Sequence, residues 1–254
     1  MSGTTNRPLV FVDLDDTLFQ TPRKMADGER FAVAFDVAGQ AISYMTPIQK
    51  QFVEWLLQTA DVIPVTARGV ETYRRVDLPF CHGAICAHGG VLLSETGELD
   101  VAWQARMQAL LRDEQARLPV LADTLLQLGR DNGLTLRTWV ETGAGLNLYA
   151  VVKHQQMQDS VLHTVLALAQ SQRLIDGLSI HLNGNNLAFL PECLGKQAAV
   201  REWIRRDQER FGERVYLGFG DSLTDLGFLG ECHWWGTPQR GQLARQIFEG
   251  LQHG

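Results

Sequence analysis

The sequence lacks a hydrophobic segment long enough to cross a membrane as a helix. Such a segment needs about 18 consecutive apolar residues, and the chain contains none. The start of the chain, MSGTTNRPLV, also lacks the basic and then apolar pattern of a secretory signal, so we expect a cytoplasmic protein. There is no block of lysine and arginine, and the formal net charge is −6. We therefore expect neither nucleic acid nor a membrane as a partner.

Cysteine is also scarce. The four cysteines are Cys81, Cys86, Cys193 and Cys232. They are scattered and form no Cys-x-x-Cys pair, so free thiols in a reducing compartment are the simplest interpretation. Zinc bound by Cys81, His82, Cys86 and His88 is a minor alternative, because these spacings match no common zinc pattern.

Apolar residues make up 45% of the chain and charged residues 20%, which is typical of a soluble globular protein. The 254 residues suffice for one large domain or two small ones with a sizeable core. No oligomeric state follows from the sequence.

Three short apolar segments, 8–13, 61–66 and 214–221, are rich in β-formers, and each ends at a polar or glycine turn. Runs without polar alternation are typical of strands buried on both faces of a parallel sheet. Helical patterns lie between or after them, at 47–59, 196–209 and 240–251. This alternation predicts an α/β fold with a doubly wound parallel sheet.

The middle of the chain follows another pattern. A helical pattern over 103–128, which Pro119 should break or kink, precedes two strand-like segments, LTLRTWVE and LNLYAVVK. A second helix at about 155–170 precedes LSIHLN and NLAFLP, which meet at the hairpin signal Asn183-Gly184. The doubled α-β-β order predicts an antiparallel sheet backed by two helices. We place this inserted α+β cap domain at 100–190, within a core formed by 1–99 and 191–254.

Residues 31–45 show the pattern of a further hairpin, either a flap near the predicted site or an edge hairpin without a catalytic role.

Polar residues gather where the predicted core elements begin or end. Asp13, Asp15 and Asp16 follow the first strand, and Thr66 follows the second. Lys196 opens a helix, and Asp221 and Asp225 follow the last strand. Each residue alone has an ordinary structural explanation, such as capping a helix or filling a turn. Ligands of parallel α/β sheets bind at the carboxyl ends of the strands, so we expect these side chains to converge.

Taken together and in this order, the segments FVDLDDTL, VIPVTAR, LGKQAAV and GFGDSLTDLGFL resemble the four motifs of the haloacid dehalogenase (HAD) superfamily of phosphatases and phosphotransferases. The insert lies between the second and third motifs, as in the branch with an αββ-repeat cap. That branch includes Cof-type sugar phosphatases and sucrose-phosphate phosphatase.

The resemblance implies a role for each motif residue. Asp13 would be the nucleophile that forms an aspartyl-phosphate, and Asp15 would transfer protons to the leaving oxygen and from water. Mg²⁺ would be bound by Asp13, the backbone carbonyl of Asp15 and Asp221, with Asp225 binding it directly or through water. Thr66 and Lys196 would bind the phosphoryl oxygens.

Several positions depart from the branch pattern. The second motif continues as Ala67-Arg68 where Gly-Arg is frequent, and HGG at 88–90 replaces a frequent Asn-Gly-Ala. Arg68 and His88 are candidates for substrate contact, although a histidine satisfied within its turn is the favoured interpretation of His88. Asp16 is interpreted as structural.

The resulting hypothesis is a Mg²⁺-dependent phosphatase acting on a small-molecule phosphate ester, most simply a sugar phosphate. A phosphomutase of the same fold is an alternative, because the nucleophile and the metal would be identical. A receiver-like module that binds phosphate without turnover is a more distant alternative, because receivers have about half this length and no cap. The polar residues of the cap strands are candidates for substrate selection: Arg137, Thr138, Trp139, Asn147, Tyr149, His181 and Asn186.

Overall fold

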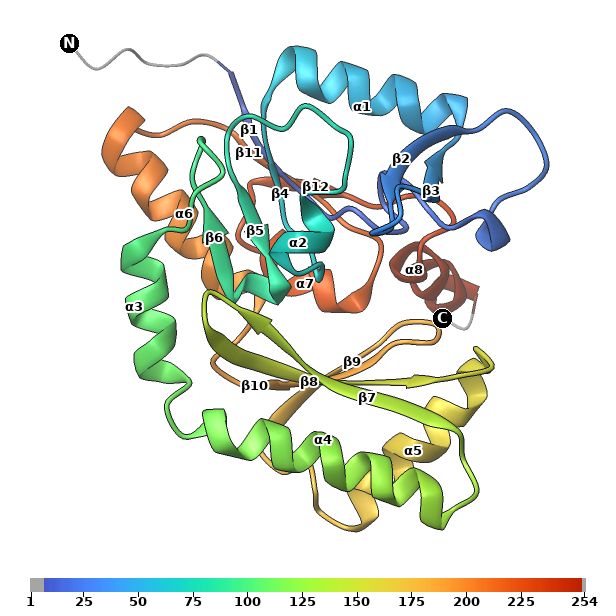
Figure 1. Ribbon diagram of the computed structural model, residues 1–254. Helices are drawn as coiled ribbons and strands as arrows, with labels where there is room; N and C mark the ends of the chain where they lie inside the picture. Colours follow the sequence, from blue (N-terminus) through green and yellow to red (C-terminus); the bar gives the residue numbers. More distant parts are fainter. Residues whose placement is uncertain (1–6, 253–254) are drawn as a thin grey trace. The chain divides into compact units, whose positions relative to one another are not determined.

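A four-stranded parallel sheet forms the centre of the first unit in the computed structural model, which describes residues 7–252. Its strands lie in the order β12-β11-β1-β4, and Figure 1 labels each of them. They comprise β1 (Leu9–Val12), β4 (Asp61–Pro64), β11 (Tyr216–Phe219) and β12 (Trp234–Gly236). The first three of these match predicted strands. The α/β fold with a parallel sheet is thus confirmed.

The central strand β1 is apolar because it has no solvent-facing side. All four of its residues are buried, with β11 paired on one edge and β4 on the other. Val10 and Val12 belong to a cluster that also contains Val53 and Leu56 from α1. Thr46 caps that helix by accepting a hydrogen bond from the Gln49 backbone, while the Gln49 side chain accepts one from the Thr46 backbone.

The helices of this unit lie between its strands in the sequence, except α8, which follows the last strand. They are α1 (Pro47–Thr59), α2 (Val70–Tyr73), α6 (Lys196–Phe211), α7 (Leu226–Leu229) and α8 (Gln242–Gln252). Three single 3₁₀ turns are present as well: η1 (Pro22–Lys24), η2 (Ala87–Gly89) and η3 (Leu223–Asp225).

Two small hairpins accompany the parallel sheet. The first pairs β2 (Phe31–Phe35) with β3 (Ala41–Met45), as predicted for residues 31–45. The second pairs β5 (Ala84–Cys86) with β6 (Val91–Leu93), and it was not predicted. A parallel bridge between Val65 and Ile85 connects this second hairpin to the β4 side of the sheet.

Val101–Gly195 forms a second compact unit, and the described residues on either side of it form the first. The chain thus divides after Asp100 and after Gly195, where we predicted divisions after residues 99 and 190. The elements of the second unit are α3 (Val101–Leu110), α4 (Glu114–Asp131), β7 (Leu136–Gly143), β8 (Leu146–His154), α5 (Asp159–Ser171), β9 (Leu178–Leu182) and β10 (Leu187–Pro191).

The four strands of this unit form an antiparallel sheet in the order β7-β8-β10-β9. Helices α4 and α5 bury one face of it, through residues such as Leu125, Val165 and Phe189. Trp139 and His181 lie on the other face, because side chains alternate along a strand and Ala150 and Leu187 point toward the helices. The doubled α-β-β arrangement agrees with the predicted pattern, preceded by the additional helix α3.

The helical segment is broken, but not at Pro119 as predicted. The helical segment is interrupted at residues 111–113, and α4 continues through Pro119. Proline removes only one hydrogen-bond donor from the helix, and the buried Leu118 and Leu121 keep the surrounding turns against the sheet.

Within residues 7–252, no helix combines the length and the apolar character needed to span a membrane.

Candidate functional site

Three aspartates meet at the carboxyl ends of the core strands. Asp13 directly follows β1, while Asp221 and Asp225 follow β11. The two strands are parallel and adjacent, with Val12 opposite Phe219, so the turns that follow them lie side by side. Carboxylate oxygens of the three residues lie within 4.8 Å of one another, and all three side chains are buried. Among the described residues this is the group of acidic and metal-ligating side chains that could hold a metal ion.

Lys196 joins this cluster from the first position of α6. Its Nζ donates hydrogen bonds to Asp13 Oδ1 at 2.6 Å and to Asp225 Oδ1 at 2.7 Å. Only 6% of the lysine side chain is exposed. A buried lysine between two carboxylates is not a solvated surface charge, and it makes the aspartate cluster compatible with a folded, metal-free protein.

Two further contacts orient the carboxylates. Thr17 Oγ1 donates to Asp13 Oδ2 at 3.2 Å, and Ser222 donates to Asp225 Oδ2 through its backbone at 3.0 Å and its hydroxyl at 2.8 Å. Gly220 permits the close approach of this turn, since a Cβ there would lie 2.7 Å from the Asp225 Cβ. The motif glycine is therefore required by packing against a site residue.

The cluster carries more negative than positive charge, and this affects its ionisation. Burial raises the pKa of Asp13 well above its usual range; Lys196 opposes this shift, whereas Asp225 and Asp221 add to it. Burial, helped by Asp225 and Asp16, raises the pKa of Asp221 to about 7. For Asp225 the effect of burial is outweighed by Lys196 and Ser222, so that its pKa is lowered. A cation in the cluster would favour the ionised forms of Asp13 and Asp221.

Burial acts on Lys196 in the opposite direction. It lowers the pKa of the ammonium group, but the adjacent Asp13 and Asp225 outweigh this effect, and the pKa is raised. Lys196 therefore keeps its positive charge within the cluster.

Asp15 is not a member of the buried cluster. Arg68 donates to both of its oxygens, from Nε and from an Nη, at 2.7 Å each. The Arg68 guanidinium also lies 5.2 Å from the centre of the Phe19 ring and 3.4 Å from the Ser43 hydroxyl, which belongs to β3. Sequence patterns made Arg68 a candidate for substrate contact and missed this bidentate pair. The pair links the first motif, the second motif and the hairpin.

Thr66 lies in the turn after β4 and is buried. Its hydroxyl accepts a hydrogen bond from the Arg68 backbone at 3.1 Å, and its carbonyl accepts one from the His88 backbone at 3.0 Å. His88 is buried and has a left-handed backbone, with φ 54°. The structure thus places His88 in a turn bonded to Thr66.

Lys24 was not predicted. Its Nζ lies 2.5 Å from Asp16 Oδ2, and Asp16 has a left-handed backbone with φ 65°. This ion pair supports the structural interpretation of Asp16. No pattern in the sequence signals Lys24, because it lies on the isolated turn η1.

The predicted zinc alternative finds no support among residues 7–252. His82 lies 3.4 Å from Asp61, and the four cysteines are free thiols, with Cys86 buried and Cys81 exposed.

Comparisons with solved structures reveal the same fold in several hydrolases. The sucrose-phosphatase of Synechocystis sp. PCC6803, solved with sucrose and phosphate, is 15% identical, with a TM-score of 0.54 and 98% of each chain covered. A haloacid dehalogenase-like hydrolase from Bacteroides thetaiotaomicron is 12% identical, with a TM-score of 0.52, over 96% of this chain and 99% of the other. An IMP-nucleotidase mutant from Plasmodium falciparum, bound to IMP, is 13% identical, with a TM-score of 0.52, over 98% of this chain and 69% of the other.

No family model and no curated protein matches the sequence. The structural likeness extends over nearly the whole chain at low identity, so it concerns the fold. The predicted fold is therefore confirmed, and one of the structures that share it is a haloacid dehalogenase-like hydrolase.

Proposed function

We propose that this protein is a Mg²⁺-dependent phosphatase that hydrolyses a small phosphate monoester through an aspartyl-phosphate on Asp13. The observation that carries the proposal is the contact of Lys196 with both Asp13 and Asp225, next to Asp221. A nucleophilic carboxylate, a fixed cation and further metal-binding oxygens are the groups that transfer of a phosphoryl group requires.

The cluster fits a magnesium ion. Its donors are carboxylate oxygens, which this hard cation prefers, and its negative charge exceeds what Lys196 supplies. Asp13, Asp221, Asp225 and the backbone carbonyl of Asp15 would hold the ion. When bound, it would neutralise charge on the phosphoryl group and help to orient it.

In the first step, an Asp13 oxygen attacks phosphorus and the bond from phosphorus to the ester oxygen breaks. Lys196 stabilises the negative charge on the phosphoryl oxygens, and Thr66 donates to one of them from its hydroxyl. Asp15 gives a proton to the leaving oxygen, so that the alcohol departs neutral.

In the second step, Asp15 takes a proton from water, whose oxygen attacks phosphorus. The bond to the Asp13 oxygen breaks, which returns a carboxylate and releases inorganic phosphate. Asp15 is thereby protonated again for the next cycle.

The pair between Asp15 and Arg68 constrains this mechanism. Both carboxylate oxygens of Asp15 accept hydrogen bonds from the Arg68 guanidinium, whereas in the first step one of these oxygens must reach the leaving oxygen of the substrate. We infer that Asp15 leaves Arg68 when substrate binds. Arg68 would thus hold Asp15 only in the substrate-free protein, and its guanidinium would become available to the substrate once Asp15 has left.

For the substrate we propose a sugar phosphate. The sucrose-phosphatase that shares the fold was solved with sucrose and phosphate. In the second unit, the sheet face that α4 and α5 leave open presents Trp139 between Arg137 and Lys153, whose cationic groups lie 4.9 and 5.7 Å from the ring centre. Trp139 Nε1 also donates to Glu141 at 3.1 Å. An aromatic ring among hydrogen-bonding groups suits a ligand rich in hydroxyls better than it suits a lipid.

The proposal is tested by measuring phosphate release with Mg²⁺ from a panel of sugar phosphates, nucleotides, phospholipids and phosphoproteins. We expect release to be fastest with a sugar phosphate and absent in Asp13→Asn. Phosphorus NMR of the same reactions detects an isomeric sugar phosphate, which would indicate a phosphomutase. A preference for nucleotides such as IMP would contradict the sugar assignment while retaining phosphatase activity. Absence of turnover across the panel would contradict the phosphatase assignment itself.

A further inference from the structure

A cavity of about 720 Å³ lies in the first unit, away from the aspartate cluster. Its lining includes Leu9 and Asp61, the first residues of β1 and β4, and Arg214, which precedes β11. Asp13 and Asp221, by contrast, follow the last residues of β1 and β11. The cavity is therefore at the amino ends of the strands, and its occupant would not compete with a substrate at the carboxyl ends.

Apolar side chains form part of the cavity wall, beside a larger number of polar and charged ones. Leu9, Ile63 and Leu93 come from strands, and Trp203 and Phe211 come from α6. The indole of Trp203 is held close to the backbone of Gly83, where a Cβ would lie only 2.6 Å from the ring. The ring thus has little room to move, and a fixed aromatic wall is a common feature of sites for small molecules.

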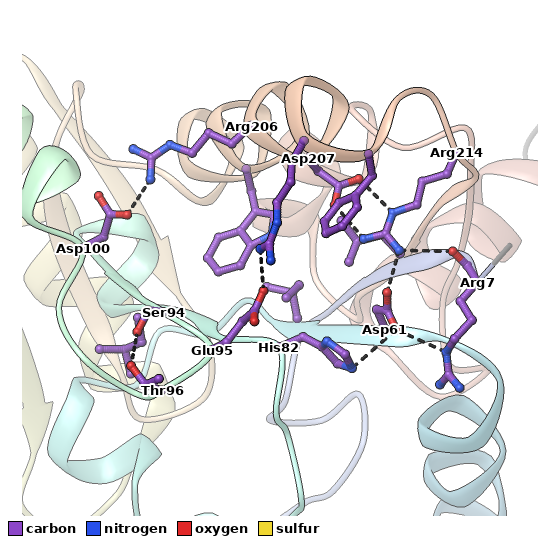
Figure 2. A pocket seen from close by; sticks show the side chains of 16 residues that line it. Arg7, Asp61, His82, Ser94, Glu95, Thr96, Asp100, Arg206, Asp207 and Arg214 are labelled. Carbon is purple, nitrogen blue, oxygen red and sulfur yellow. Dashed lines mark hydrogen bonds and ion pairs between the residues drawn. The ribbon is translucent and has the colours of Figure 1, made fainter. Parts of the chain in front are cut away.

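Ion pairs border the two ends of the cavity (Figure 2). Asp100 and Arg206 form one at one end, and Arg214 joins Asp61 and Asp207 at the other. Arg214 and Asp207 are only 8% and 5% exposed, so that pair belongs to the packing of the fold.

A more exposed pair connects the two sides of the cavity. Arg210 of α6 lies 2.9 Å from Glu95, which follows β6, and their side chains are 63% and 57% exposed. The Arg210 guanidinium also lies over the ring of Phe211, at 4.6 Å from its centre. Exposed ion pairs contribute little to stability, so a ligand can replace each partner by its own charged group.

A ligand that separates Arg210 from Glu95 must supply a charged group for each of them, and this requirement determines its chemical class. A simple anion would pair with Arg210 and leave Glu95 without its cation, and a simple cation would do the reverse. A zwitterion satisfies both charges at once, and an apolar body attached to it would contact Trp203 and Leu93. We propose that this cavity binds a free α-amino acid with a large apolar side chain, with its carboxylate on Arg210 and its ammonium on Glu95.

The proposal is independent of the phosphatase assignment and is tested by calorimetric titration of the full-length protein with L-phenylalanine. Three matched probes each lack one feature: 3-phenylpropionate lacks the ammonium, phenethylamine lacks the carboxylate, and glycine lacks the apolar side chain. We expect L-phenylalanine to bind at least about tenfold more tightly than any of the three, since each lost interaction corresponds to roughly that factor.

Two variants examine the charged contacts separately. Arg210→Gln and Glu95→Gln should each weaken binding of L-phenylalanine by about tenfold, without a change in melting temperature because both residues are exposed. Arg205→Gln is the matched control. Arg205 is an exposed arginine of the same helix that pairs with Glu202 and Glu209 and does not line the cavity. Equal binding of L-phenylalanine and 3-phenylpropionate, unchanged binding in both variants, or no binding at millimolar concentration would overturn the proposal.

Discussion

At the scale of single residues, Lys196 compensates the negative charge of the buried aspartate cluster in the folded protein. It contacts two buried carboxylates, and its own side chain is buried with them. Removal of one partner from a buried ion pair leaves uncompensated charge in a medium of low polarity.

Lys196→Met should therefore lower the free energy of unfolding of the metal-free protein by roughly 3–5 kcal/mol in urea denaturation. Mg²⁺ should recover part of this loss, because it would supply the missing positive charge. Lys50→Met is the control, since Lys50 pairs with Glu54 on an exposed surface and its loss should change stability by less than about 1 kcal/mol. Similar losses in the two variants would contradict the account of the cluster.

Asp15 provides a second prediction at this scale. Asp15→Asn should slow the first step far more with alkyl phosphates, whose leaving oxygen needs a proton, than with p-nitrophenyl phosphate. The comparison is made by single-turnover kinetics with both esters. Equal slowing of both esters would remove Asp15 from the proton-donor role.

At the scale of elements, the turn after β11 depends on a glycine. A Cβ at Gly220 would lie 2.7 Å from the Asp225 Cβ and 2.9 Å from its carboxylate, so a side chain there must displace the aspartate. Gly220→Ala should reduce the rise in melting temperature that Mg²⁺ causes. Gly250→Ala on α8 is the control, because an added Cβ there meets nothing within 4 Å. If Mg²⁺ raised the melting temperature of Gly220→Ala as much as that of the unchanged protein, the position of Asp225 would not depend on this glycine.

The strands also show which parts of the fold can be predicted from sequence patterns. The strands β1, β4 and β11 were predictable because burial on both faces demands continuous apolar runs. The short strands β5, β6 and β12 were not, since three residues are too few to establish a period. Asp13, Thr66 and Asp221 lie just after β1, β4 and β11, as predicted, and parallel strands place their carboxyl ends along one edge.

The pairing of Asp15 with Arg68 could not be predicted from the same patterns. The two residues are 53 positions apart, and their contact depends on the detailed course of the turns after β1 and β4. The pair between Lys24 and Asp16 likewise depends on the placement of a short isolated turn. Patterns of residue type indicate which groups are candidates for chemistry, whereas their hydrogen bonds follow from the folded backbone.

At the scale of the whole molecule, the second unit has a core of its own. Its buried cluster contains only residues between Leu118 and Phe189, contributed by α4, α5, the four strands and Ile175 between α5 and β9. A fragment of residues 111–195 should therefore fold alone and unfold cooperatively, which circular dichroism during urea titration would measure. A gradual loss of signal without a transition would show that this unit requires the first one.

The central claim is that Asp13 carries the phosphoryl group during turnover, and it is tested most directly by trapping that intermediate. The protein is mixed with p-nitrophenyl phosphate and Mg²⁺, quenched in acid within the first turnover, and digested for mass spectrometry. We predict a phosphoryl group on the peptide that contains Asp13, and none in Asp13→Asn or without Mg²⁺. Phosphate release at an undiminished rate from Asp13→Asn, or a phosphoryl group on another residue, would contradict the account.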